Sequence, residues 1–331
     1  MVLIINKPED VSDQVLQGAT FLHSDIIEKI PNSNIIVQKH FSKNQVALIG
    51  GGGIGHEPSD FGFVGDGMLT ACVNGKIFQP APAKEILRAI KSVYTKYGVL
   101  IIIKNFERDL NVCLEAEKLA REEGMQVDHV IVNDDCSIEK RDNYKKRRRG
   151  VSGTVLVHKI LGAAAKEGKS LAELKEIGDK VVYAMNTLGV ATASGTCIET
   201  PNKPLFELPE QHISYGVGIH GEAGYRVEPF RSSENLANEL LNKLIDFYDV
   251  NEESQFAILI NGMGATTAME LAIFAHDVSR LSVLNELNIS FVKAGSFLTS
   301  TNMSGVSLTL LKLQENSWLR FLEAPTSAFA W

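Results

Sequence analysis

The sequence lacks the residue patterns on which several classes of protein depend. It has only four cysteines, with no CxxC pair and no cluster of histidine and cysteine, which argues against a disulfide framework or a zinc site. No apolar run is long enough to span a membrane, and the short apolar N-terminus lacks the features of a signal peptide. We therefore expect a soluble cytoplasmic protein with reduced thiols and no bound metal.

The sequence also lacks an excess of positive charge. The formal net charge is −7, whereas binding to nucleic acids depends mainly on clustered lysines and arginines. One basic run, KKRRRG from Lys145, is the exception. It predicts either a solvated loop, which we favour, or a site for phosphate or an acidic partner. The sequence also shows no internal repeat and no low-complexity tail, so a globular protein without direct nucleic-acid contacts is expected.

Apolar runs of strand length recur in the first part of the chain, at residues 46–50, 98–104 and 129–134. Between the second and third runs, apolar residues fall at helical spacing until Gly124. The order strand, helix, strand predicts a parallel sheet covered by helices. In such sheets, ligands bind at the carboxyl ends of the strands.

The pattern changes towards the second half of the chain. A long helical pattern, broken at EGKS, predicts helix over residues 151–191, and three prolines then mark residues 192–212 as a connection. We place a domain boundary near residue 190. Beyond it, we expect a helix at 233–248, a second helix after residue 262, and strands at 213–219, 256–262, 289–295 and 306–313.

The stretch VALIGGGGIGHEP, residues 46–58, predicts a buried strand followed by a glycine-rich loop. Gly50, Gly52 and Gly55 match the pattern GxGxxG of dinucleotide sites. Such a site needs a second strand that ends in an acidic residue about twenty residues later. Asp66 comes too early for this role and lies between glycines. A nucleotide-dependent oxidoreductase is therefore disfavoured.

Four side chains at predicted strand ends could carry chemistry. His56 follows the glycines directly, and either contacts a ligand or satisfies loop carbonyls. Lys104 and Asp109 follow the second strand, and form either a functional pair at the same rim or a solvated ion pair. His220 lies in the turn GVGIHGEAG, where a neutral imidazole could capture a ketone or aldehyde as a hemiaminal. The histidines that we interpret as structural or surface residues are His23, His40, His129, His158, His212 and His276.

Eight segments in order resemble the dihydroxyacetone-binding subunit of dihydroxyacetone kinases, the DhaK family. They are GGGIGHEP, GFVGDGMLTACVNGKIF, IIIKNFERD, VNDD, RRGVSGTVLVHKI, GVGIHGEAG, LINGMGATTAMEL and SLTLLKL. The resemblance covers almost the whole chain and implies a homodimer of two-domain α/β subunits. Residues 1–190 would form a three-layer α/β/α domain with a mainly parallel sheet. Residues 191–331 would form a smaller α/β domain with a mixed sheet.

The resemblance also implies roles for individual residues. His220 stands where the family forms a covalent hemiaminal with dihydroxyacetone, and His56 and Asp109 match acid/base residues near the ligand hydroxyls. The other positions that we assign to ligand contacts are Gly53, Ile54, Gly55 and Lys104. In the family this subunit binds no ATP and no other cofactor, because a separate ADP-binding subunit donates the phosphoryl group.

The departures from the family pattern lie around these residues. They are Ile54 for serine, Ser59-Asp60 for Ala-His, QPAP from Gln79 for Thr-Ser-Pro-Thr, Glu107-Arg108 for Thr-Gly, and Ala223 for proline. They alter the loops where a donor subunit would dock. We therefore predict a regulatory protein similar to the DhaQ paralogue, which is a coactivator of a TetR-like transcription factor for dihydroxyacetone kinase genes in glycerol metabolism. The alternative is the substrate-binding subunit of a working kinase, since the residues that carry chemistry are retained.

Overall fold

The computed structural model describes residues 3–137, 148–200, 203–222 and 224–331. The chain forms two compact units, each assembled from separate segments. Unit 1 comprises residues 1–132, 154–182 and 321–331, and unit 2 comprises residues 133–153 and 183–320. The chain therefore passes between the units several times, whereas the sequence suggested one boundary near residue 190. Segment exchange of this kind leaves no mark in hydrophobic patterning, because each segment is locally an ordinary strand, helix or loop.

Unit 1 contains a six-stranded sheet with the strand order β1-β2-β4-β3-β5-β6. Its strands are β1 (Ile27–Lys29), β2 (Ile35–Gln38), β3 (Ala47–Ile54), β4 (Ala71–Ile77), β5 (Val99–Lys104) and β6 (Val127–Val132). β3 pairs in parallel with β4 and with β5, and β5 pairs in parallel with β6. At the other edge, β2 pairs antiparallel with both β1 and β4. The mainly parallel sheet expected for this part of the chain is confirmed.

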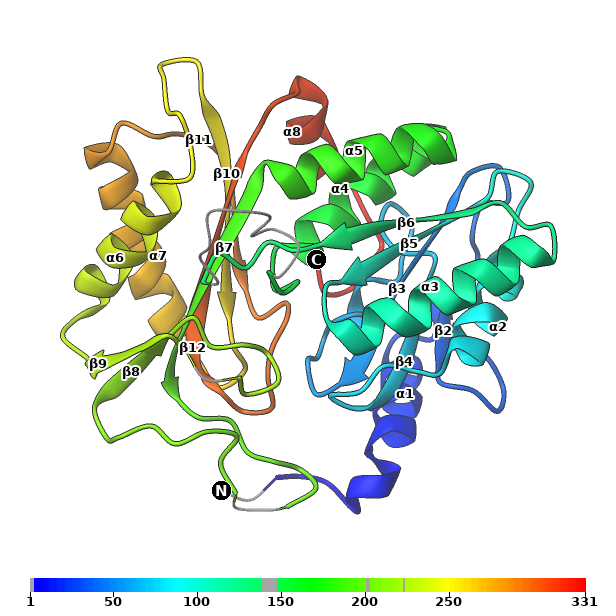
Figure 1. Cartoon of the computed structure of the whole chain (residues 1–331), viewed down its shortest axis with the longest axis horizontal. Helices are drawn as coiled ribbons and strands as arrows, with labels where there is room; N and C mark the ends of the chain where they lie inside the picture. The colour runs from blue at the N-terminus through cyan, green and yellow to red at the C-terminus, as the bar shows by residue number, and fades with distance from the viewer. Residues whose placement is uncertain (1–2, 138–147, 201–202, 223) are drawn as a thin grey trace. The chain divides into compact units, whose positions relative to one another are not determined.

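Helices cover both faces of this sheet. They are α1 (Val11–Leu22), α2 (Ala83–Val93), α3 (Glu107–Glu122), α4 (Thr154–Lys166) and α5 (Leu171–Tyr183), together with the short helices η1 (Pro8–Asp10) and η2 (Phe61–Phe63). α2 and α3 pack side by side and share a core with Ile49 of β3 (Figure 1). The next residue, Gly50, faces His158 of α4. Because successive strand residues point to opposite faces, α4 covers the other face, which gives the expected three layers.

Unit 2 contains a second six-stranded sheet, with the order β11-β10-β12-β7-β8-β9. Its strands are β7 (Met185–Ala193), β8 (His212–Tyr215), β9 (Arg226–Pro229), β10 (Gln255–Gly262), β11 (Asn288–Gly295) and β12 (Ser304–Lys312). β10 and β11 pair in parallel and all other neighbours pair antiparallel. The expected mixed sheet is confirmed.

One element of unit 2 contradicts the sequence prediction. Helix was expected over residues 151–191, but α5 ends at Tyr183 and β7 begins at Met185, paired with β12 and β8. The first seven residues of β7 are all buried. A strand covered on both faces shows no alternation of polar and apolar residues, so its pattern is easily mistaken for a continuing buried helix.

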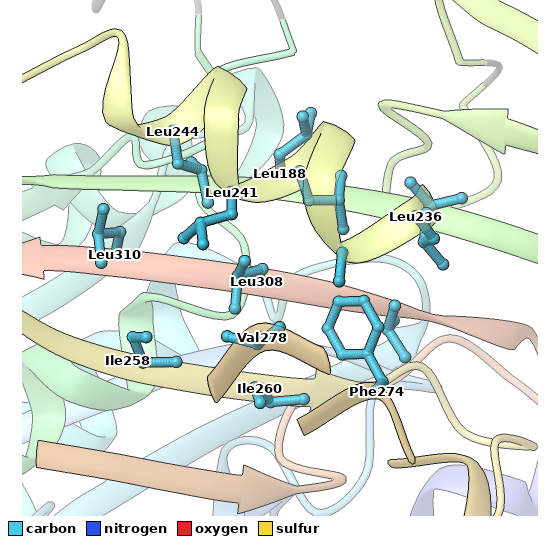
Figure 2. Close-up of a cluster of buried hydrophobic side chains, with 14 of the residues drawn as sticks. Leu188, Leu236, Leu241, Leu244, Ile258, Ile260, Phe274, Val278, Leu308 and Leu310 are labelled. Carbon is cyan, nitrogen blue, oxygen red and sulfur yellow. The ribbon is translucent and has the colours of Figure 1, made fainter. Parts of the chain in front are cut away.

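Two helices, α6 (Ser233–Ile245) and α7 (Ala268–Leu284), cover one face of the second sheet. Leucines of α6 and Phe274 and Val278 of α7 point towards Leu188, Ile258 and Leu308 of the strands (Figure 2). Each such side chain contributes about 1.5–3 kcal/mol when fully buried. Thr267 and Glu270 form a capping box that fixes the start of α7. The last helix is α8 (Asn316–Glu323), and no described helix has the length and apolarity needed to cross a membrane.

Candidate functional site

The glycine run of VALIGGGGIGHEP belongs to a strand, which corrects the predicted loop. β3 continues to Ile54, and Gly51 and Gly52 pair with Val73 and Asn74 of β4. A Cβ atom on Gly51 would lie 2.5 Å from the Val73 carbonyl oxygen. Gly53 is equally restricted, because its Cβ would lie 2.5 Å from the Gln79 backbone nitrogen. These glycines therefore allow protein backbone to approach protein backbone.

Gly52 is the member of the run that faces functional groups. A Cβ atom there would lie 3.4 Å from Lys104 Nζ and 3.6 Å from Asp109 Oδ1. Lys104 ends β5 and Asp109 lies in the first turn of α3, so consecutive elements deliver both side chains. Both are buried. The cation and the carboxylate thus converge on the carboxyl end of β3, as the sequence predicted for this edge of the sheet.

The ion-pair partner of Lys104 is Asp60, which the sequence reasoning noted only as a departure from the family. Lys104 Nζ donates to Asp60 Oδ2 at 2.6 Å and to the Gly51 carbonyl at 2.8 Å. Both side chains are almost fully buried. Asp109 is buried as well, so the predicted alternative of a solvated pair of Lys104 and Asp109 is wrong. Burial raises the pKa of Asp60, but the charge and hydrogen bond of Lys104 outweigh it and leave the pKa below its ordinary value.

His56 is buried at the end of the glycine run, with 2% of its surface exposed. Its ring lies 5.0 Å from the ring of Phe78, tilted by 33°. The turn after β3 begins at Gly55, and the next helical element is the short η2. His56 is therefore held by packing in unit 1, on the same strand end as Gly52.

His158 is a buried histidine, which the sequence analysis predicted to be a structural or surface residue. It lies on α4 with no exposed surface, and neither ring nitrogen has a hydrogen-bond partner within the described part of the chain. Burial lowers the pKa of His158 to about 4, although the negative charge of Asp60 opposes this shift. The ring is therefore neutral at pH 7.

The lowered pKa of His158 predicts a pH dependence of stability. The folded-state pKa lies below the ordinary value, so the stabilisation is present above pH 6.5 and is lost as the pH falls towards 4. A shift of this size corresponds to about 3 kcal/mol. We expect His158→Leu to unfold like the wild type within about 1.5 kcal/mol at pH 7, and to lose less stability on acidification. Urea unfolding at pH 7 and pH 4.5 measures this difference.

His276 provides the control for this experiment, because it is an exposed histidine on α7. His276→Gln should keep the pH dependence of the wild type. Identical pH dependence in wild type and His158→Leu would contradict the assignment of this acid-sensitive term to His158.

His220 lies in unit 2, and Glu222 fixes the orientation of its imidazole. Glu222 Oε1 lies 3.2 Å from His220 Nδ1, and Oε2 accepts a hydrogen bond from the His220 backbone N–H at 2.9 Å. Burial raises the pKa of Glu222, but hydrogen bonding and the charges of His220 and Arg149 lower it to about 2. An ionised carboxylate only accepts hydrogen bonds, so Nδ1 carries the proton in this contact. In the neutral imidazole, the lone pair is then on Nε2. The sequence analysis did not assign a role to Glu222, although it lies in the same turn, GVGIHGEAG, as His220.

The basic run from Lys145 was predicted to be a solvated loop, but its described residues, Arg148 and Arg149, make specific contacts. Arg148 is fully buried, donates to Asn186 Oδ1 at 2.7 Å and stacks over Phe247. Arg149 donates to Asp135 at 2.6 Å. Both arginines are thus used inside unit 2. Residues 145–147 lie outside the described part of the chain.

The remaining departures take different places in the fold. Ile54 is buried and pairs with Ile77. Gln79 follows β4 against Gly53, and Glu107 begins α3. Ala223 lies outside the described residues. Within unit 1, therefore, the structure brings Gly52, Lys104 and Asp109 together, and His220 is placed with Glu222 in unit 2.

Comparison with known proteins identifies relatives along the full length of the chain. Residues 17–330 match the Dak1 domain family. The chain is 44% identical over 328 residues to DhaK, the dihydroxyacetone-binding subunit of a PTS-dependent dihydroxyacetone kinase from Lactococcus lactis, with 99% of this chain and 98% of the relative covered. It is 43% identical over 329 residues to the DhaKLM operon coactivator DhaQ of the same organism, with 98% and 99% covered. A solved DhaQ structure, described as a dihydroxyacetone kinase operon co-activator, superposes with a TM-score of 0.90 at 42% identity, covering 96% of this chain and 97% of that one.

Proposed function

The chain belongs to the Dak1 domain family, and we propose that it is a dihydroxyacetone-binding regulatory protein that captures the ketone covalently on His220. The observation that supports covalent capture is the hydrogen bond between His220 Nδ1 and Glu222, because it favours the neutral tautomer whose lone pair is on Nε2, the nitrogen proposed to bond to the carbonyl carbon. His56 and Asp109 are proposed to orient a ligand hydroxyl or exchange its proton. Gly53, Ile54, Gly55 and Lys104 are proposed as further ligand contacts.

The pair formed by Lys104 and Asp60 favours regulation over catalysis. Phosphoryl transfer benefits from cations that are directed at the charge developing on the transferred group. Here the ammonium of Lys104 is neutralised by a carboxylate at 2.6 Å and also donates to a backbone carbonyl. Such a lysine can support binding of a neutral ketone, but it offers little net charge to a phosphoryl group. We infer a role as coactivator of a TetR-like transcription factor, with a homodimer as the functional form.

The alternative is the substrate-binding subunit of a working kinase. It is supported by the similarity to DhaK and by the presence of His56, Asp109 and His220. In that case the ligand would be phosphorylated by a separate ADP-binding donor subunit.

Mixing the chain with dihydroxyacetone and a donor subunit separates the two functions. We expect no sustained formation of dihydroxyacetone phosphate, while an active DhaK protein in parallel turns over. We also expect a TetR-like regulator from the same organism to bind the chain in the presence of dihydroxyacetone and not in its absence. Turnover comparable to the active DhaK protein would contradict the regulatory proposal.

A further inference from the structure

Arg149 connects two backbone segments of unit 2 through one guanidinium group. Nε donates to Asp135 Oδ2 at 2.6 Å, and Nη2 donates to Ser137 Oγ at 3.0 Å. Nη2 also donates to the carbonyl of Gly216 at 2.8 Å, at the start of the turn that carries His220. The Arg149 side chain is only 12% exposed. Arg149 is therefore anchored by Asp135 and Ser137, and it holds Gly216 at the start of the turn that carries His220.

The same guanidinium also faces the carboxylate that orients His220. Arg149 Nη1 lies 4.0 Å from Glu222 Oε2. The two groups close around Gly218, where a Cβ atom would lie 2.5 Å from Nη1 and 1.9 Å from Glu222 Oε2. The Gly218 N–H donates to the Glu222 carbonyl at 3.1 Å, which closes the turn. A side chain at position 218 would force the arginine and the glutamate apart.

We propose that Arg149 is a positioning residue for covalent capture, which acts by holding Glu222 where it accepts a hydrogen bond from Nδ1–H of His220. This inference rests on the proposed function, because it concerns the same imidazole. Without Arg149, the Glu222 carboxylate loses the guanidinium that lies 4.0 Å away, and the turn loses its hydrogen bond from Arg149 to the Gly216 carbonyl. The imidazole can then rotate or exchange tautomers, which removes the lone pair from Nε2 in part of the population.

The capture step shows why the tautomer matters. The Nε2 lone pair forms a bond to the carbonyl carbon, the carbonyl π bond breaks, and the carbonyl oxygen takes a proton from solvent. The Nδ1 proton stays in the hydrogen bond to Glu222, so the adduct is a cationic imidazolium facing an ionised carboxylate. A histidine that is protonated on Nε2 and bare on Nδ1 cannot form this adduct in the same place.

Side-chain ¹⁵N resonances of His220, recorded at mildly alkaline pH without ligand, test the proposal independently of dihydroxyacetone binding. We expect the wild type to show the Nδ1–H tautomer, Arg149→Met to show a mixture, and Arg149→Lys to fall between them. Adduct formation with dihydroxyacetone should slow by about 10- to 100-fold in Arg149→Met. Arg280→Met removes an arginine that pairs with Glu234 and Asp277 on the helices, and should match the wild type in both measurements.

The outcomes distinguish this inference from the proposed function. A wild-type tautomer and a wild-type adduct rate in Arg149→Met would overturn the positioning role. If the wild type forms no adduct at all, the proposed function fails, while the tautomer measurement still decides whether Arg149 orients His220. If Arg149→Met does not fold, Arg149→Lys is decisive, since an unchanged tautomer and rate there would contradict a role for the guanidinium geometry.

Discussion

His220→Ala is expected to abolish covalent binding of dihydroxyacetone. The variant removes the only atom to which the ketone carbon is proposed to bond, and the remaining polar contacts are reversible. Intact-protein mass spectrometry under native conditions should show one ligand per chain in the wild type and none in the variant. Glu222→Gln should retain capture at a reduced rate, because the amide can still accept a hydrogen bond from Nδ1 but does not offset the charge of the adduct.

A buried histidine outside the proposed site provides the control for this experiment. His158→Leu replaces a buried histidine on α4 with a side chain of similar size. This variant should bind the ligand as the wild type does. Persistence of the adduct in His220→Ala, together with its loss in His158→Leu, would reverse the assignment.

Lys104→Met is expected to destabilise the protein by about 3–5 kcal/mol, because it leaves the buried carboxylate of Asp60 without its cation. Adding Asp60→Asn should recover much of the loss, since an amide removes the uncompensated charge. Urea unfolding at pH 7 of the wild type, the two single variants and the double variant measures the coupling between the two residues.

An exposed pair serves as the matched control. Lys91 Nζ lies 2.7 Å from Glu123, but both side chains are about half exposed, so Lys91→Met should cost less than about 1 kcal/mol. Equal losses in Lys104→Met and Lys91→Met would show that burial does not strengthen the dependence of Asp60 on its partner.

Local patterns predicted the strands β3, β5, β6, β8, β10, β11 and β12, but not β1, β2, β4, β7 or β9. The buried runs at 46–50, 98–104 and 129–134 became neighbouring strands, because apolar β-branched segments between helical patterns can pair only inside a covered sheet. β7 was missed because it is buried on both faces. The glycines of β3 were interpreted as a loop since their close contacts with Val73 and Gln79 depend on packing that the sequence does not display.

The candidate site was predicted unevenly for the same reason. Positions at strand ends, such as Lys104 and Asp109, follow from topology, and their convergence on Gly52 could be expected. The partner of Lys104 could not, because Asp60 reaches it across 44 residues of chain. Glu222 was detectable in principle, since it stands two residues after His220 in a glycine-rich turn, where a short loop brings side chain and backbone together.

A nitrogen–carbon coupling measurement tests covalent capture most directly. The chain, labelled with ¹⁵N in its histidines, would be mixed with dihydroxyacetone labelled with ¹³C at the carbonyl carbon. We predict a tetrahedral ¹³C resonance, one per chain, with a one-bond coupling to Nε2 of His220. A bound ligand that shows only its ketone or hydrate carbon, without coupling to any histidine nitrogen, would contradict the proposal.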